Sequence, residues 1–296
     1  MSSKFVNLYG KHFFLGNSIQ HIKPVKVSSL LLQNGLKLFP KSSTSSSTSF
    51  LKSSLNYNVL KQASIFSLIF IGVTTISIPY IFQYTPLKYF QKHPNQLIYG
   101  IIGLNLAVFL LWQIPRNYKL LSRYALLEKD VLYSKWSIIG SAFSHQELWH
   151  LGMNMLALYS FGTSLSMMIG SSNFLTLYLN SAVLSSLVSI AYPILFKLPI
   201  TAPSLGASGA LFAVFGTFAC LVPNAKILLF VFPIPGGAMV AFLGATVWNV
   251  AGCVMRWGSF DYAAHLGGSI AGLGYGWYIS DKVRKERERR MRSFRF

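Results

Sequence analysis

Long apolar runs recur along this chain, separated by shorter stretches that hold most of its prolines, charges and polar residues. About 20 apolar residues suffice for a helix to cross a bilayer, and several of the runs are that long. The pattern predicts an all-α polytopic membrane protein with seven spans: 63–84, 96–114, a third that includes 145–154, 174–196, a fifth that begins at 208, 238–255, and a seventh from about 261.

Composition supports this interpretation. Hydrophobic residues make up 52% of the 296 residues and charged residues only 11%, against about a quarter charged in soluble domains. The net charge of +19 would suit a nucleic-acid-binding protein, but the basic residues flank apolar spans. Membrane topology and targeting explain that placement better, so we expect no nucleic-acid partner. Both cysteines, Cys220 and Cys253, fall in apolar runs and are read as small hydrophobic residues.

Residues 1–62 are rich in lysine and serine and contain no acidic residue, so we expect them to be mostly disordered. Such a leader is typical of an organelle transit peptide, although it uses lysine where arginine is usual; an ordinary basic tail is the alternative. Residues 281–296 form a second basic tail, with eight Lys/Arg against three acids. The positive-inside rule would hold that tail in the matrix, whereas seven crossings after a transit leader would place it on the opposite side.

Two connections differ from simple turns. Residues 115–148 mix charged, aromatic and apolar side chains over a length unusual for a compact bundle, which favours a segment in the membrane interface. Residues 224–237 contain two prolines and paired glycines, so this segment is predicted to be a loop or short extended stretch. The span at 238–255 is barely long enough to cross and is the candidate for a mobile helix.

The first chemical motif is Gly206-Ala207-Ser208-Gly209, directly before an apolar run. It places Ser208 at the start of a helix, where unpaired backbone N–H groups can bind a developing oxyanion. The flanking glycines, Gly206 and Gly209, let other backbone approach closely. The alternative is that Ser208 only caps the helix, since serine is a preferred N-cap residue.

A second motif lies in the third span, where His150 and Asn154 are one helical turn apart and share a face. Polar groups inside a membrane usually face the bundle interior, either for function or to hydrogen-bond a neighbouring helix for packing. His145 and His150 are five residues apart, which rejects the His-Glu-x-x-His zinc spacing, and we expect no metal and no cofactor. His145 is placed at the mouth of the helix.

The third motif puts His265, Gly268 and Gly272 on one face of the last span. Rows of small residues let membrane helices touch backbone to backbone, so His265 projects from a face shaped for close contact. If the neighbour is the helix that starts at Ser208, a hydroxyl and an imidazole can meet as nucleophile and base. Asp261, one turn before His265, could orient the imidazole or cap the helix.

Together these motifs resemble the rhomboid family of intramembrane serine proteases over roughly residues 96–280. The resemblance implies a six-helix core, preceded here by one extra transmembrane helix at 63–84, as in the mitochondrial inner-membrane branch. It implies that Ser208 is the nucleophile and His265 the general base. It further implies that His150 and Asn154 help the Ser208 backbone N–H to bind the oxyanion. Many bacterial members have a tyrosine where this chain has Phe212, which can stack on His265 but cannot hydrogen-bond to it.

The resemblance implies a protease that cleaves single-pass membrane proteins of the mitochondrial inner membrane, including a dynamin-like GTPase. Its expected partners are therefore transmembrane substrates and the lipid bilayer. Two other classes stay open as hypotheses, an inactive rhomboid-like scaffold and a polytopic transporter. Inactive relatives typically lack the serine or the histidine, and a transporter would favour charged spans and broken helices in paired repeats.

Overall fold

The computed structural model describes residues 45–199, 202–229, 232–258 and 260–293, and nearly every element in these ranges is a helix. The elements are, in order, α1 (Ser45–Tyr84), the 3₁₀ turn η1 (Pro86–Lys88), α2 (Tyr89–Lys92), α3 (Pro94–Trp112), η2 (Pro115–Asn117), α4 (Tyr118–Tyr124), α5 (Ser137–Gly140), η3 (Ser141–Phe143), α6 (Leu148–Ala157), η4 (Leu158–Gly162), α7 (Thr163–Ile169), α8 (Ser171–Leu195), α9 (Ser208–Leu221), β1 (Ile227–Leu229), β2 (Phe232–Ile234), α10 (Gly237–Val254) and α11 (Tyr262–Ser293). The predicted all-α polytopic fold is confirmed.

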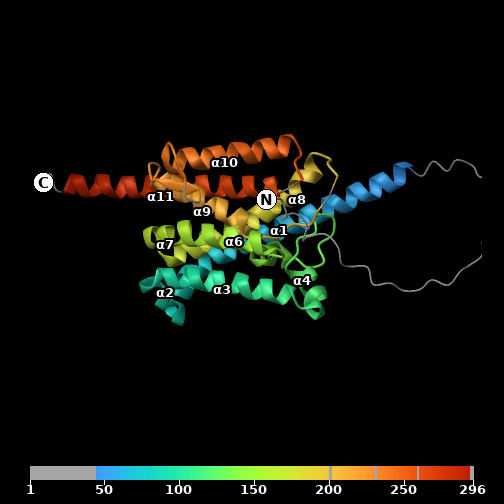
Figure 1. Cartoon of the computed structure of the whole chain (residues 1–296), viewed down its shortest axis with the longest axis horizontal. Helices are drawn as coiled ribbons and strands as arrows, with labels where there is room; N and C mark the ends of the chain where they lie inside the picture. Colours follow the sequence, from blue (N-terminus) through green and yellow to red (C-terminus); the bar gives the residue numbers. More distant parts are fainter. Residues whose placement is uncertain (1–44, 200–201, 230–231, 259, 294–296) are drawn as a thin grey trace, which may run out of the picture. The chain divides into compact units, whose positions relative to one another are not determined.

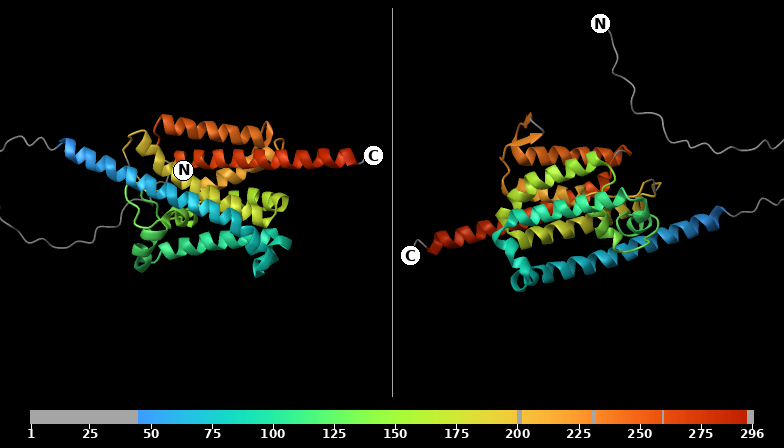
Figure 2. Two further views of the ribbon diagram at one scale, coloured as in Figure 1. Left: turned by 180° about the vertical axis from the view of Figure 1, so that it is seen from behind. Right: turned by 60° about the horizontal axis from the view of Figure 1, so that its bottom comes forward.

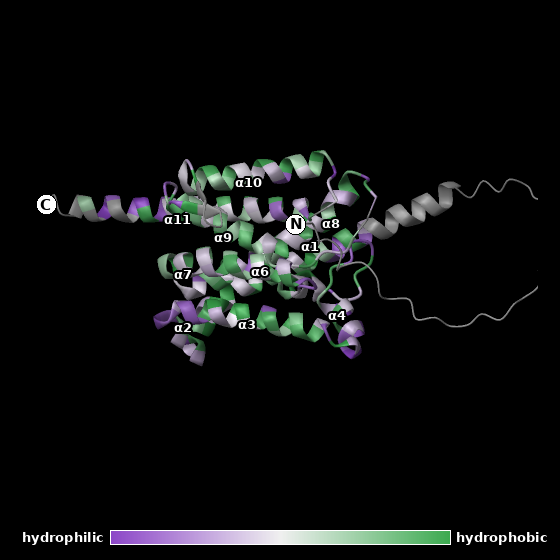
Figure 3. Cartoon of the chain, in the orientation of Figure 1, coloured by the Kyte–Doolittle hydropathy of each residue, from purple (hydrophilic) through white to green (hydrophobic). Residues whose placement is uncertain are grey.

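The predicted spans appear as these helices, with boundaries shifted by a few residues except at the start of α1. In the described ranges, four helices are long and apolar enough to cross a membrane: residues 57–84 of α1, and α3, α8 and α10, with α9 a shorter apolar helix. The third span is α6 and α7, joined without a break by the π-helical turn η4. Figure 3 shows hydrophobic residues along the helices and hydrophilic ones gathered in α2, near α4 and toward the C-terminal end of α11.

The helices form one bundle, with α10 at one edge and α3 at the opposite edge in Figure 1. Between them, α9 packs closely along α11, because glycines remove the side chains that would hold the helices apart. A Cβ added to Gly272 would lie 2.5 Å from the carbonyl oxygen of Ala213, and one added to Gly276 would lie 2.7 Å from Cβ of Cys220. Helices that touch in this way hold any side chains they carry in a fixed relation.

The expected disordered leader is wrong over its last part, because α1 begins at Ser45 rather than near residue 63. Residues 1–44 lie outside the described residues. The helix extends below residue 63 because Val59 and Ala63 are buried in an apolar cluster with Ile190 and Ile194 of α8 and its neighbours. Figure 2 shows α1 running along the outside of the bundle.

The connection 224–237 is the extended segment that its prolines predicted. Strands β1 and β2 pair antiparallel, with Ile227 opposite Ile234. The glycine Gly237 follows with a positive φ of 79°, and α10 begins there. The long connection 115–148 is not regular, but it contains α4, α5 and two 3₁₀ turns.

Candidate active site

Ser208 is the first residue of α9, and its side chain does not cap that helix. The N-cap is Ala207, without a side-chain capping bond, so the capping alternative does not describe Ser208. The chain enters the helix through Gly206, whose φ of +122° only glycine adopts readily. A Cβ at Gly206 would lie 2.7 Å from Cε1 of His150, so the same glycine also makes room for that ring.

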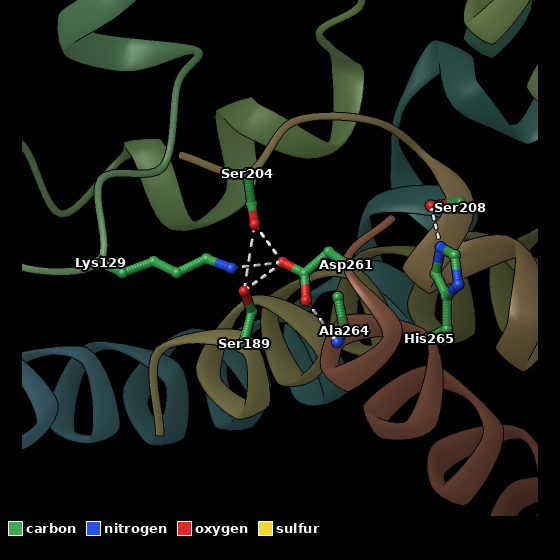
Figure 4. A network of polar contacts seen from close by, with 7 residues as sticks. All are labelled: Lys129, Ser189, Ser204, Ser208, Asp261, Ala264 and His265. Atoms are coloured by element: carbon green, nitrogen blue, oxygen red, sulfur yellow. Dashed lines mark hydrogen bonds and ion pairs between the residues drawn. The ribbon is translucent and has the colours of Figure 1, made fainter. Parts of the chain in front are cut away.

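The hydroxyl of Ser208 instead faces α11. Ser208 Oγ lies 2.8 Å from Nε2 of His265, as Figure 4 shows. The contact between α9 and α11 fixes this distance, because a Cβ at Gly268 would overlap the carbonyl oxygen of Gly209. The motif glycines on this interface therefore bring the serine and the histidine together. They are Gly209, Gly268 and Gly272. Gly209 also lies against Ser185 of α8, whose Cβ would be 2.5 Å from an added Cβ.

The imidazole of His265 is enclosed on several sides. The ring of Phe212 stacks on it with centroids 4.6 Å apart, at the position where the sequence suggested stacking. Its second nitrogen, Nδ1, lies 2.8 Å from Oδ1 of Asn249 on α10. Sequence reasoning missed Asn249, although a lone amide within the apolar run 238–255 was a visible signal.

His150 and Asn154 line the same cavity as Ser208. Both line a cavity of about 290 Å³ together with Ser208 and His265, and most of its other walls are apolar side chains: Met153, Ala157, Phe161, Leu211, Phe212, Phe215, Ala245 and Phe260. Asn154 Nδ2 donates one hydrogen bond to the carbonyl oxygen of His150, at 2.7 Å. An amide nitrogen carries two hydrogens, so one donor remains for a group in the cavity.

His145 precedes α6, as expected, but it is fully buried rather than open at the helix mouth. Its ring lies edge-on to that of His150, with centroids 4.9 Å apart, and its Nε2 accepts a hydrogen bond from the backbone N–H of Ala207 at 3.4 Å. His145 therefore supports the turn that leads to Ser208.

Asp261 is the centre of a polar network at the start of α11 (Figure 4). One carboxylate oxygen accepts the backbone N–H of Ala264 at 3.0 Å, which is the capping role. The other accepts from Lys129 Nζ at 3.0 Å and from the hydroxyls of Ser189 and Ser204. Because both ring nitrogens of His265 face other residues, Asp261 does not orient the imidazole.

This network stabilises the charged form of the Asp261 carboxyl group. Burial raises the pKa of the Asp261 carboxyl, but Lys129, the two hydroxyls and the Ala264 amide together lower it below its ordinary value. Lys129 comes from the connection 115–148, so the ion pair ties that connection to the helix that carries His265. Neither Lys129 nor the serines could be matched to Asp261 from the sequence, since all three are more than 50 residues away from it.

Comparison with known proteins gives a consistent set of relatives. Residues 133–282 match the Rhomboid domain family. Over 216 residues the chain is 62% identical to Rhomboid protein 1, mitochondrial, of Saccharomyces cerevisiae, covering 73% of this chain and 62% of that protein. It is 33% identical to the Presenilin-associated rhomboid-like protein, mitochondrial, of Rattus norvegicus over 198 residues, or 66% and 51% of the two chains. A match at 29% identity to RHOMBOID-like protein 12, mitochondrial, of Arabidopsis thaliana covers 59% and 56%. The aligned part thus spans between half and two thirds of each relative.

Proposed function

The chain belongs to the rhomboid family, and from that premise we propose that it is an intramembrane serine endopeptidase that cuts transmembrane segments of single-pass proteins. The observation that carries the proposal is the 2.8 Å separation between Ser208 Oγ and His265 Nε2 beside an apolar cavity. A hydroxyl within hydrogen-bond reach of an imidazole is the arrangement that nucleophilic catalysis needs.

In the proposed reaction Ser208 is the nucleophile and His265 the base. Nε2 takes the hydroxyl proton while Oγ forms a bond to the scissile carbonyl carbon, which gives a tetrahedral oxyanion. The imidazolium then gives that proton to the leaving amine as the carbon–nitrogen bond breaks. Water attacks the remaining ester by the same route, with His265 taking its proton, and this releases the acid and restores Ser208.

We assign oxyanion binding to His150, Asn154 and the backbone N–H of Ser208. Two observations support the assignment: both side chains line the cavity with Ser208, and the N–H of the first residue of a helix has no partner within that helix. Donors that are already in place cost no reorganisation when the charge develops. Residues 133–282, which match the family, contain all three of these groups.

A transmembrane substrate must unwind locally before its peptide bond can reach Ser208, because a helical peptide bond is shielded by its own turns. We propose that α10 and the connection 115–148 move to admit it. The position of α10 supports this, because it lies at the edge of the bundle, and only Ala238, Phe242, Asn249 and Gly252 of its 18 residues are buried.

We place the protein in the mitochondrial inner membrane as a multi-pass protein, since the relatives are named mitochondrial and the chain carries several helices long enough to cross. Single-pass inner-membrane proteins, including a dynamin-like GTPase, are then the proposed substrates.

The test is cleavage of a single-pass reporter by purified protein in liposomes. Ser208→Ala and His265→Ala should each abolish cleavage, and the double variant should be no worse, because the two groups act as a unit. Ser160→Ala, which removes an exposed helical hydroxyl elsewhere, is the matched control and should cleave normally. Cleavage by a folded Ser208→Ala variant at the normal rate would exclude the proposed mechanism.

A further inference from the structure

Asn249 is the one polar side chain that α10 directs at the histidine. It is 2% exposed, whereas its neighbours Val247, Trp248 and Val250 are 67%, 59% and 46% exposed. An amide buried inside a membrane protein is costly unless its groups are hydrogen-bonded. The apolar surroundings of α10 therefore single out Asn249 as a residue with a specific partner.

The hydrogen bonds of Asn249 fix which way its amide points. Nδ2 donates to the carbonyl oxygen of Ala245 at 2.8 Å, one turn earlier on the same helix. The other end of the amide, Oδ1, is therefore the atom that faces His265 Nδ1 at 2.8 Å. A carbonyl oxygen can only accept a hydrogen bond, so Nδ1 must carry the hydrogen.

This assignment determines the state of the other ring nitrogen. A neutral imidazole carries one hydrogen, so a protonated Nδ1 leaves Nε2 with a free lone pair. Nε2 is the atom that lies 2.8 Å from Ser208 Oγ. The contact with Asn249 thus selects the tautomer in which His265 can accept the serine proton.

We propose that Asn249 is a positioning residue that holds His265 in its base-competent tautomer and ring orientation. The inference rests on the proposed function, in which His265 is the base. When Nε2 takes the proton of Ser208, Nδ1–H stays on Nδ1 and continues to donate to Asn249. The amide then stabilises the imidazolium without taking a proton. The other ionisable groups near the ring are His150 from α6, Asp261, which is paired with Lys129, and Tyr262, whose ring centroid lies 6.4 Å from that of His265.

The positioning residue and the base come from different helices. Contact between α10 and α11 at this level depends on Gly252, where a Cβ would lie 2.5 Å from the ring of Tyr262. Any displacement of α10 away from α11 separates Asn249 from His265. The base is therefore complete only while α10 is packed against the bundle, which links the position of this helix to turnover.

The test compares three purified variants in liposomes with the reporter substrate. Asn249→Leu removes the acceptor and leaves the buried Nδ1–H of His265 without a partner. The kcat should then fall about 10- to 100-fold with little change in KM. Asn249→Asp keeps an acceptor of the same shape and should restore most of the turnover. Because a carboxylate stabilises the imidazolium, the acid limb of the pH–rate profile of this variant should move to higher pH. Asn105→Leu is the matched control, because Asn105 is also buried and donates to a backbone carbonyl one turn earlier, at 2.8 Å.

A spectroscopic measurement separates positioning from packing. Nitrogen NMR of ¹⁵N-histidine-labelled protein, assigned by the His265→Ala difference, should show the Nδ1–H tautomer in wild type and a shift toward the other tautomer in Asn249→Leu. The proposal would be overturned if Asn249→Leu kept the wild-type kcat and the wild-type His265 tautomer. It would also be overturned if the acid limb of the pH–rate profile of Asn249→Asp did not move. If Asn249→Leu does not fold, the Asn249→Asp profile decides alone. Full activity of Ser208→Ala would instead refute the proposed function.

Discussion

Gly268 offers the sharpest structural test, because the approach of α9 to α11 depends on its missing side chain. A Cβ at this position would overlap the carbonyl oxygen of Gly209 and lie 2.9 Å from the carbonyl carbon and 3.2 Å from Cβ of Phe212. Carbon atoms in contact are about 3.5–4.0 Å apart, so Gly268→Ala must separate the helices by at least ~0.6 Å. The group in the way is the backbone carbonyl of Gly209, which, unlike a side chain, cannot change rotamer to make room.

That displacement has two consequences of different size. Overpacking of a close contact costs about 1–3 kcal/mol of folding free energy, partly offset by the ~1 kcal/mol that alanine gains over glycine within a helix. The effect on activity should be larger, because Gly268 is one turn from His265 and faces the residue after Ser208. A misplacement of about 1 Å can cost roughly 10²-fold in rate, so we expect turnover to fall at least about tenfold.

The assay measures reporter cleavage in liposomes and thermal unfolding in detergent for Gly268→Ala and for Gly274→Ala. Gly274 is the matched control, because it lies on the same helix and an added Cβ would meet nothing within 4 Å. Gly274→Ala should keep wild-type turnover and unfold at the same or a slightly higher temperature. Wild-type turnover in Gly268→Ala would show that the separation of α9 and α11 does not set the distance between Ser208 and His265.

Three further predictions follow from the site and its surroundings. Asn154→Ala and His150→Ala should each lower kcat by up to about 10²–10³-fold with substrate binding largely kept, as steady-state kinetics would show; unfolding with full activity in the folded fraction would mark them as packing residues. Lys129→Ala should destabilise the protein by about 3 kcal/mol in chemical denaturation, while Lys135→Ala, an exposed lysine of the same connection, should change little. Because the pKa of the Asp261 carboxyl is lowered in the folded protein, the stability that the ion pair contributes is present above a pH of about 4, the ordinary carboxyl pKa. It is lost as the pH falls through the lower pKa of the folded state. A loss of stability in Lys129→Ala that persists unchanged below that pH would contradict the ion pair as its cause. The predicted topology, an N-terminus delivered to the matrix followed by seven crossings, places the C-terminus in the intermembrane space. A C-terminal tag should then be digested by protease once the outer membrane is opened; protection until the inner membrane is dissolved would mean that one span does not cross.

The sequence was most informative where local chemistry and geometry coincide. A helix start at Ser208 was predicted from a glycine-flanked serine before an apolar run, and α9 begins at that residue. The spacing of Gly268 and Gly272 predicted that the last span closely approaches a neighbouring helix, and the structure identifies that neighbour as α9.

Pairings between distant segments could not be obtained in the same way. An apolar run predicts that a helix crosses the membrane but not which helix lies beside it, so the partners of Asp261 in three other segments were not predictable. His145 was predicted at the mouth of the helix rather than on a buried face, whereas it is fully buried and contacts the turn before Ser208, a segment 62 residues away. The span predicted at 63–84 begins earlier in the structure, where Val59 and Ala63 pack against Ile190 and Ile194 of α8, a contact that the composition of residues 1–62 does not reveal.

The proposed nucleophile can be tested without any knowledge of the natural substrate. Purified protein in detergent is treated with a fluorophosphonate, which forms a covalent bond to an activated serine, and the labelled residue is mapped by mass spectrometry. We expect one label, on Ser208, that is lost in His265→Ala and slowed in Asn249→Leu. A label on another serine, or labelling of Ser208 at the same rate without His265, would contradict the claim that these two residues form the catalytic pair.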